Sequence, residues 1–238
     1  MVQNPTDATA CRALLNETIA RICVGRSGDR MRTSTYLRLR ADHSVAMDAV
    51  WTEVDETIID ALGFYKMQTL VRNKEEYVTR PDLGRRFSKE TLDALVKDCA
   101  FQPDVQVVVA DGLSAFAIQE NLRDVYAVLR DGLEAQQYRL GTPVFVRYGR
   151  VATMDPISEV LHARVTVLLV GERPGLAVGS SMGCYMAYES SSAKPESQRT
   201  VISNIHRNGT PPVEAGAQIV DLVGTLMREK KSGVALQG

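Results

Sequence analysis

Short β-branched runs that alternate with helical patterns after residue 102 constrain the fold of this chain more than any other feature. The runs at 105–110 and 165–170 are apolar almost throughout, as strands covered on both faces require. Five segments have strand character. They are residues 105–110, 143–148, 165–170, 183–188 and 200–205. Strands that alternate with helices are typical of α/β folds, so we expect a Rossmann-like sheet domain over residues 102–238.

Capping residues and apolar periodicity mark the helices between these strands. Ser114 can cap a helix whose apolar residues recur at helical spacing. These residues are Ile118, Leu122, Val125, Leu129 and Leu133. A short helix is expected at 157–161. Thr210-Pro-Pro212 opens a last helix, where proline is tolerated because its missing N–H would be unbonded anyway.

The first hundred residues predict a smaller, mainly helical N-terminal domain. Over residues 7–24, apolar residues recur at three- and four-residue intervals, which favours a helix ending around Gly25 or Gly28. The residues concerned are Leu14, Leu15, Ile19, Ile22 and Cys23. Residues 29–86 are rich in charge and short of β-runs, and Ser88 can cap a further helix. We therefore divide the chain into a helical region, 1–101, and the sheet domain, 102–238.

Charge and composition exclude several classes of partner. The 28 Lys and Arg residues nearly cancel the 29 Asp and Glu residues, so no general field attracts nucleic acid or an anionic membrane. Four widely spaced cysteines favour a reducing cytosol over a secreted disulfide scaffold. No apolar run approaches the roughly 20 residues that cross a bilayer, and residues 1–5 do not begin a signal peptide. We expect no nucleic-acid partner, no membrane partner and no export.

Four loops follow predicted strands and are candidates for a common site. They begin at Asp111, Arg150, Gly171 and His206. Ligands of open α/β sheets bind beyond the carboxyl ends of the strands, so these loops could converge on one crevice. The alternative is that Gly112, Gly171 and Gly175 merely permit tight turns.

Several familiar catalytic and metal motifs are absent. Gly171-Glu-Arg-Pro-Gly175 follows a strand but lacks the G-x-G-x-x-G fingerprint, which argues against NAD binding. Gly112-Leu-Ser-Ala-Phe116 departs from the nucleophile elbow at its last residue, and helix capping explains Ser114. The three histidines are isolated from cysteine or carboxylate at metal-site spacing, so we predict no metal site.

Six blocks of the chain, in order, resemble the light chain of ethanolamine ammonia-lyase. The blocks are Thr79-Arg-Pro-Asp-Leu-Gly-Arg-Arg86, Asp111-Gly-Leu-Ser114, Val146-Arg-Tyr-Gly-Arg-Val151, Gly171-Glu-Arg-Pro-Gly175, Ile202-Ser-Asn-Ile-His206 and Gly209-Thr-Pro-Pro-Val-Glu214. The resemblance implies a subunit of an adenosylcobalamin-dependent lyase that converts ethanolamine to acetaldehyde and ammonia by a radical mechanism. It also implies a hetero-oligomer in which the heavy chain carries the substrate and the catalytic side chains, so we assign no catalytic residue here. Residues 1–101 would then make subunit contacts.

The same resemblance implies three cobalamin-binding positions. Val151 would present a small apolar side chain, and Glu172 would accept a hydrogen bond from a corrin amide. Val201 stands where related light chains commonly have cysteine, so only a contact made by backbone or shape would survive there. The Asp-x-His-x-x-Gly motif of proteins that replace the cofactor's benzimidazole is absent at Asp42-His43, so the benzimidazole should stay on cobalt.

Two alternatives remain open at the level of sequence. One is a stand-alone cobalamin-binding or chaperone module without lyase activity. The other is an independent α/β enzyme, for which the sequence offers no set of acid, base and nucleophile. Some light chains have a long N-terminal extension associated with entry into a bacterial microcompartment, whereas residues 1–5 begin close to the shared core. We therefore expect a cytoplasmic complex.

Overall fold

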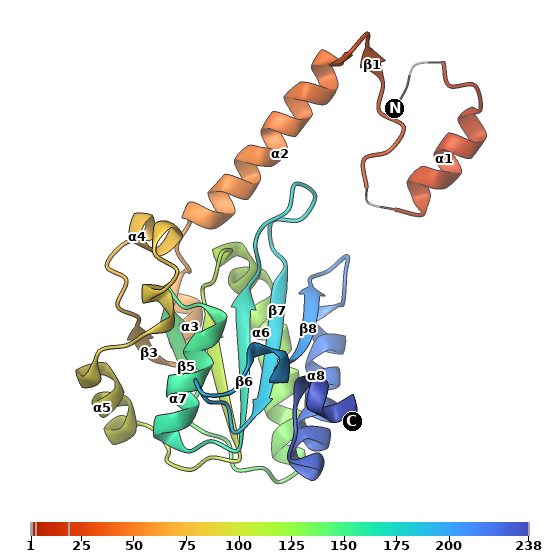
Figure 1. Ribbon diagram of the computed structural model, residues 1–238. Coiled ribbons are helices and arrows are strands. Elements are labelled where there is room, and N and C mark those ends of the chain that lie inside the picture. Colours follow the sequence, from red (N-terminus) through yellow and green to blue (C-terminus); the bar gives the residue numbers. More distant parts are fainter. Residues whose placement is uncertain (1, 3, 19, 238) are drawn as a thin grey trace.

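The structure, a computed structural model, describes residues 2, 4–18 and 20–237 (Figure 1). Met1, Gln3, Ile19 and Gly238 lie outside the described residues. The place of Ile19 in the predicted first helix therefore stays a prediction.

A six-stranded sheet with the order β3-β5-β4-β6-β7-β8 forms the centre of the fold. Its strands are β3 (Tyr65–Gln68), β4 (Val105–Ala110), β5 (Val144–Arg147), β6 (Val165–Gly171), β7 (Met182–Tyr188) and β8 (Thr200–Ile205). The first four in spatial order are parallel, and β7 is antiparallel to both of its neighbours. β8 therefore runs in the same direction as β6. The predicted α/β fold is confirmed.

All five predicted strands are present, each within one residue or so of the expected bounds. Every residue of β4 and β6 is buried, which explains their continuous apolar runs. The sequence did not predict β3, a four-residue edge strand in the region expected to be helical. It pairs with β5 over its full length. The division into 1–101 and 102–238 stays a prediction.

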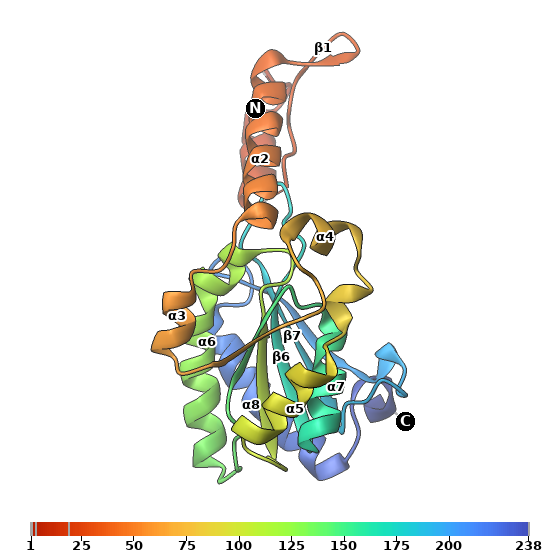
Figure 2. The ribbon, with the colours of Figure 1, turned by 90° about the vertical axis from the view of Figure 1, so that its left-hand side faces the viewer.

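Helices cover both faces of the sheet (Figures 1 and 2). On one face, α6 (Ala115–Ala135) and α8 (Pro212–Glu229) pack against each other and over the sheet. On the other face lie α5 (Lys89–Asp98) and α7 (Met154–Leu161). The predicted caps are confirmed, since Ser88 and Ser114 accept backbone N–H groups at the starts of α5 and α6.

The remaining elements are short helices around the sheet. They are α3 (Glu56–Ala61), α4 (Lys74–Thr79) and the 3-10 turns η1 (Leu83–Arg85), η2 (Val151–Thr153), η3 (Glu196–Gln198) and η4 (Gly233–Gln237). None of the helices in the described part of the chain is long and apolar enough to cross a lipid bilayer.

An arm made of residues 8–51 projects from the sheet (Figures 1 and 2). It contains α1 (Ala8–Asn16), the two-stranded ribbon of β1 (Arg26–Ser27) and β2 (Arg30–Met31), and α2 (Thr33–Trp51). The predicted helix over 7–24 is too long, because α1 ends at Asn16. None of its side chains is buried, so no core holds the later residues in a helix, and Ile22 and Val24 line a cavity instead.

We expect the contact between the β4 and β6 loops to be essential for stability. Gly112 has a φ of +60°, and a Cβ there would lie 2.2 Å from the Gly171 carbonyl oxygen. Gly63 has a φ of +72° but no atom within 4 Å of an added Cβ. Gly63→Ala should therefore cost only the backbone strain, about 1–2 kcal/mol, and Gly112→Ala should cost about 1–3 kcal/mol more. Urea unfolding of both variants measures the difference, and equal losses would contradict the close contact.

Candidate functional site

The four candidate loops lie at one edge of the sheet. β4, β5 and β6 are parallel, so the loops that begin at Asp111, Arg150 and Gly171 leave the same edge. Ile205, at the end of β8, pairs with Met182, which in turn pairs with Gly171. The loop that begins at His206 therefore leaves this edge as well. All four loops therefore leave the carboxyl edge, where α/β sheets bind ligands, and their convergence on one crevice stays a prediction.

Asp111 joins the loops after β4 and β5. Its carboxylate accepts N–H groups from Gly112 at 2.9 Å, Tyr148 at 2.8 Å and Gly149 at 2.9 Å. Burial raises the pKa of this carboxyl to about 6, although the three N–H groups and Lys74 favour the ionised form. Tyr148 has a φ of 57°, a strained backbone conformation for a bulky residue. The three bonds hold the turn that leads to Val151.

Lys74 supplies a buried positive charge behind this turn. The residue is only 8% exposed, and its Nζ lies 5.3 Å and 6.0 Å from the ring centroids of Tyr77 and Tyr148. Burial lowers the pKa of Lys74, and Asp111 and Glu53 oppose that change. Tyr77 also donates its hydroxyl to the Gly149 carbonyl oxygen at 2.9 Å. This arrangement rigidifies the loop rather than offering a free base.

Glu172, the first residue after β6, lies against the sheet. Its Oε2 atom accepts the Ser181 hydroxyl at 2.6 Å and the Asn204 N–H at 3.3 Å. The described part of the chain donates no hydrogen bond to Oε1, the other oxygen of this carboxylate. A Cβ on Gly183 would lie 2.9 Å from that Oε1 atom, so the absence of a side chain at residue 183 makes room for the carboxylate.

The sheet face beside Glu172 is open where β7 and β8 pair. Gly183 pairs with Val170, whose side chain belongs to the buried cluster under α5 and α7. Among the described residues, no β8 side chain belongs to that cluster. Tyr185 packs at its border and pairs with Val201, which is 48% exposed. Two helices thus cover most of this face and leave an apolar surface at β7 and β8.

Tyr185, which the sequence did not single out, lies beside Val201 and close to Glu172, and it borders the apolar cluster that Val151 also contacts. Val151, in η2, packs against the same apolar cluster as Tyr185. Val201 is the strand partner of Tyr185. Burial raises the pKa of the Tyr185 hydroxyl, and the charge of Glu172 adds to the effect. Gly183, Tyr185 and Ala187 occupy alternate positions of the predicted strand, so they face the same side of the sheet. An aromatic residue between two small ones was the sequence signal for Tyr185.

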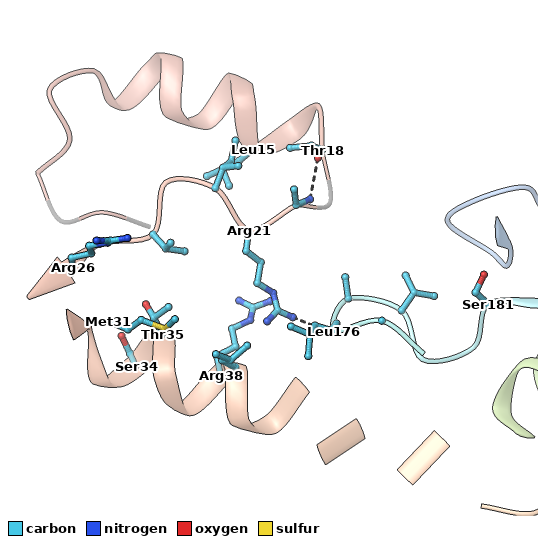
Figure 3. A pocket seen from close by; sticks show the side chains of 18 of the residues that line it. Leu15, Thr18, Arg21, Arg26, Met31, Ser34, Thr35, Arg38, Leu176 and Ser181 are labelled. Atoms are coloured by element: carbon cyan, nitrogen blue, oxygen red, sulfur yellow. Dashed lines mark hydrogen bonds between the residues drawn. The ribbon is translucent and has the colours of Figure 1, made fainter. Parts of the chain in front are cut away.

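A cavity of about 1220 Å³ separates the arm from the loop 172–181 (Figure 3). Glu172, Ser181 and Asn204 line it on the sheet side. Arg21 and Arg38 enter from the arm, and Figure 3 shows their guanidinium groups close to Leu176. Arg21 forms an ion pair with Asp42 and donates to the Leu176 carbonyl oxygen at 3.2 Å. The loop that carries Glu172 therefore contacts the sheet at one end and the arm at its tip.

Ser114 and His206 have structural roles at this edge. The Ser114 hydroxyl accepts the Ala117 N–H and donates to the Gly179 carbonyl oxygen at 2.6 Å, so it supports the same loop. His206 Nδ1 accepts the Asn208 N–H at 3.2 Å, and Nε2 lies 2.7 Å from Asn204 Oδ1. Across residues 2, 4–18 and 20–237, no group of three or more His, Cys, Asp or Glu side chains has an arrangement suited to a metal ion.

Asp111→Asn should destabilise the fold by about 1–3 kcal/mol, because one amide N–H would face a backbone N–H. The loss should also depend on pH. The pKa of Asp111 rises from an ordinary 3.8 to about 6 on folding, so its stabilising contribution is largest below the lower value and falls as the pH rises through the higher one. The free energy of unfolding should therefore differ more between wild type and variant at about pH 4 than at about pH 8, by on the order of 2 kcal/mol. An equal difference at both pH values in urea unfolding would contradict a raised pKa.

Comparison with known proteins gives the family. The family model described as "Ethanolamine ammonia-lyase light chain (EutC)" matches residues 8–237. The ethanolamine ammonia-lyase small subunit of Clostridium acetobutylicum is 61% identical over 220 residues, which are 92% of this chain and 91% of that protein. The ethanolamine ammonia-lyase small subunit of Clostridium tetani is 46% identical over 237 residues, which are 100% of this chain and 80% of that protein. The chain therefore belongs to the ethanolamine ammonia-lyase light-chain family.

Proposed function

We propose that this chain is the small subunit of an adenosylcobalamin-dependent ethanolamine ammonia-lyase and binds the cofactor at its interface with the large subunit. The observation that carries the cofactor part is the position of Glu172. A carboxylate oxygen without a bond from the described part of the chain lies beside an uncovered apolar surface, at the sheet edge where ligands of this fold class bind. Family membership supports the assignment to a lyase of two subunits.

The residues present fit a corrin. Corrin amides carry N–H donors, and an ionised carboxylate has about four acceptor sites, of which Glu172 uses two within the chain. Tyr185 and the exposed Val201 offer an apolar surface to a flat macrocycle, and Val151 continues it at the end of β5. A contact through Val201 depends on shape, so the loss of the family's usual cysteine would not remove it.

The role of this chain in the reaction is to bind and orient. Adenosylcobalamin supplies the radical chemistry when it is bound, and the protein supplies position and exclusion of water. Glu172 fixes one edge of the cofactor, and the turn held by Asp111 fixes Val151. The substrate and the side chains that act on it belong to the large subunit in this proposal.

Ammonia release should require both subunits. We expect the purified chain with adenosylcobalamin and ethanolamine to release no ammonia, and addition of the large subunit to restore release, because the site is completed at the interface. Copurification of the two co-expressed chains is the companion measurement. Turnover by the isolated chain would overturn the assignment, and failure to copurify with the large subunit would favour a stand-alone cobalamin-binding module.

Glu172→Ala should weaken cobalamin binding to the assembled complex by roughly ten- to a hundredfold, since a bond to a charged acceptor is worth about 1.5–3 kcal/mol. Glu172→Gln retains an acceptor and should lose less. Cobalamin affinity is measured spectroscopically on the purified complex, independently of turnover.

Two matched variants separate a cofactor contact from support of the loop. Ser181→Ala removes the internal 2.6 Å bond but keeps the carboxylate, so it should retain most of the affinity. Glu134→Ala removes an exposed carboxylate from the far end of α6 and should have no effect. If Ser181→Ala weakens binding as much as Glu172→Ala, Glu172 acts by holding the loop. If Glu172→Ala stays within about twofold of wild type, the contact does not exist.

A further inference from the structure

Two of the four cysteines lie against each other in the arm. Cys11 belongs to α1, and Cys23 lies in the segment that leads to β1. Their sulfur atoms are 2.6 Å apart, and both residues are half-buried. This distance is shorter than an ordinary contact between two thiols, and a disulfide bond is about 2.05 Å long. Little movement therefore separates the dithiol from a bonded pair.

Neither partner is held away by the surrounding backbone. α1 ends at Asn16, and the described residues between it and Cys23 form no helix. The Cys23 carbonyl oxygen accepts the Val2 N–H at 2.7 Å, which fixes the backbone of Cys23 but leaves its side chain free to turn. The other two cysteines, Cys99 and Cys184, are buried in the body of the fold and serve as internal controls.

We infer that Cys11 and Cys23 form a redox site, at which a small-molecule disulfide such as oxidised glutathione converts the two thiols into an intramolecular disulfide bond. One protein thiolate attacks the small disulfide, which forms a mixed disulfide and releases one small thiolate. The second protein thiolate then attacks the protein sulfur of the mixed disulfide and releases the second small thiolate. The protein loses two protons and two electrons, and one small disulfide becomes two small thiols.

The bond has a direct consequence for the cavity. Leu15 from α1 and Ile22 and Val24 from the following segment line the same wall. In the dithiol state, α1 has no buried side chain to hold it there. The disulfide joins the two parts of the wall and closes a loop of 13 residues, from Cys11 to Cys23, which removes many of the open conformations of the arm.

The reaction should be faster at alkaline pH. The contact with Cys23 raises the pKa of Cys11, so a smaller fraction is thiolate at neutral pH, and the thiolate is the reacting species. The full chain is therefore treated with oxidised glutathione at about pH 8.5 and at about pH 7. Intact mass and peptide mapping should show the loss of two hydrogen atoms and a Cys11–Cys23 crosslink, with Cys99 and Cys184 still alkylatable after unfolding.

Trypsin provides a second measurement. Arg12 and Arg21 lie between the two cysteines, so cleavage there leaves the N-terminal piece attached in the oxidised chain until a reductant is added. In Cys11→Ser the piece should separate at once, and Cys23 should carry glutathione instead. Cys99→Ser should behave as wild type.

Three results would overturn the proposal. They are glutathione adducts on both cysteines without a crosslink, a disulfide between two chains in place of the internal one, or oxidation of Cys99 or Cys184 ahead of the pair. Because Cys11 and Cys23 lie in the arm and not in the core, the serine variants should fold, and retention of the wild-type unfolding transition checks this.

Discussion

The carboxylate of Asp111 is tied to the backbone of two loops, and the geometry of the carboxyl edge depends on it. A buried carboxylate is costly unless hydrogen bonds and an opposite charge compensate it. Here three N–H groups and the nearby Lys74 offset part of that cost, and burial still raises the pKa of the carboxyl to about 6. The hydrogen bonds from Tyr148 and Gly149 hold the strained turn at Tyr148, and that turn leads to η2. The close approach of Gly112 to Gly171 joins the third loop to the other two.

An uncovered sheet face suits a chain whose family works in a complex of two subunits. An isolated globular protein gains stability by covering such a face, because each exposed apolar side chain forgoes its burial energy. In this chain, α5 and α7 cover the face as far as Tyr185 and leave Val201 exposed. The arm adds further exposed apolar residues, among them Leu37 and Trp51. Contact with other molecules would bury the apolar side chains of both surfaces.

The sequence predicted those parts of the fold that local physics determines. The runs at 105–110 and 165–170 are buried on both faces, so their apolar character follows from their place in the sheet. Ser88 and Ser114 cap helices through their own side chains, which is a local interaction. β3 was missed because it is an edge strand of only four residues, too short for its alternation of apolar and polar residues to predict a strand. The length of α1 was wrong because helical spacing was present without a core to bury it.

The candidate site was predictable only in part, because it depends on strand directions and on contacts between residues that are distant in sequence. Convergence of the loops at one edge follows from parallel strands, but β7 is antiparallel, and the sequence does not show the direction of a strand. Lys74 and Tyr185 act through residues distant in sequence, at Asp111 and Val201 respectively. The positions Val151, Glu172 and Val201 came from family resemblance, and their contact with cobalamin stays a prediction.

The loop from Glu172 to Ser181 has a mechanical consequence for the molecule. Glu172 and Ser181 close its base, Ser114 supports Gly179, and Arg21 holds Leu176 at its tip. The short segment from Leu176 back to Glu172 therefore connects the arm to the carboxylate. By the reciprocity of coupled equilibria, a ligand that fixed this carboxylate would also restrain the arm. The loop joins the projecting arm to the sheet, so the position of its tip and the position of its base depend on each other.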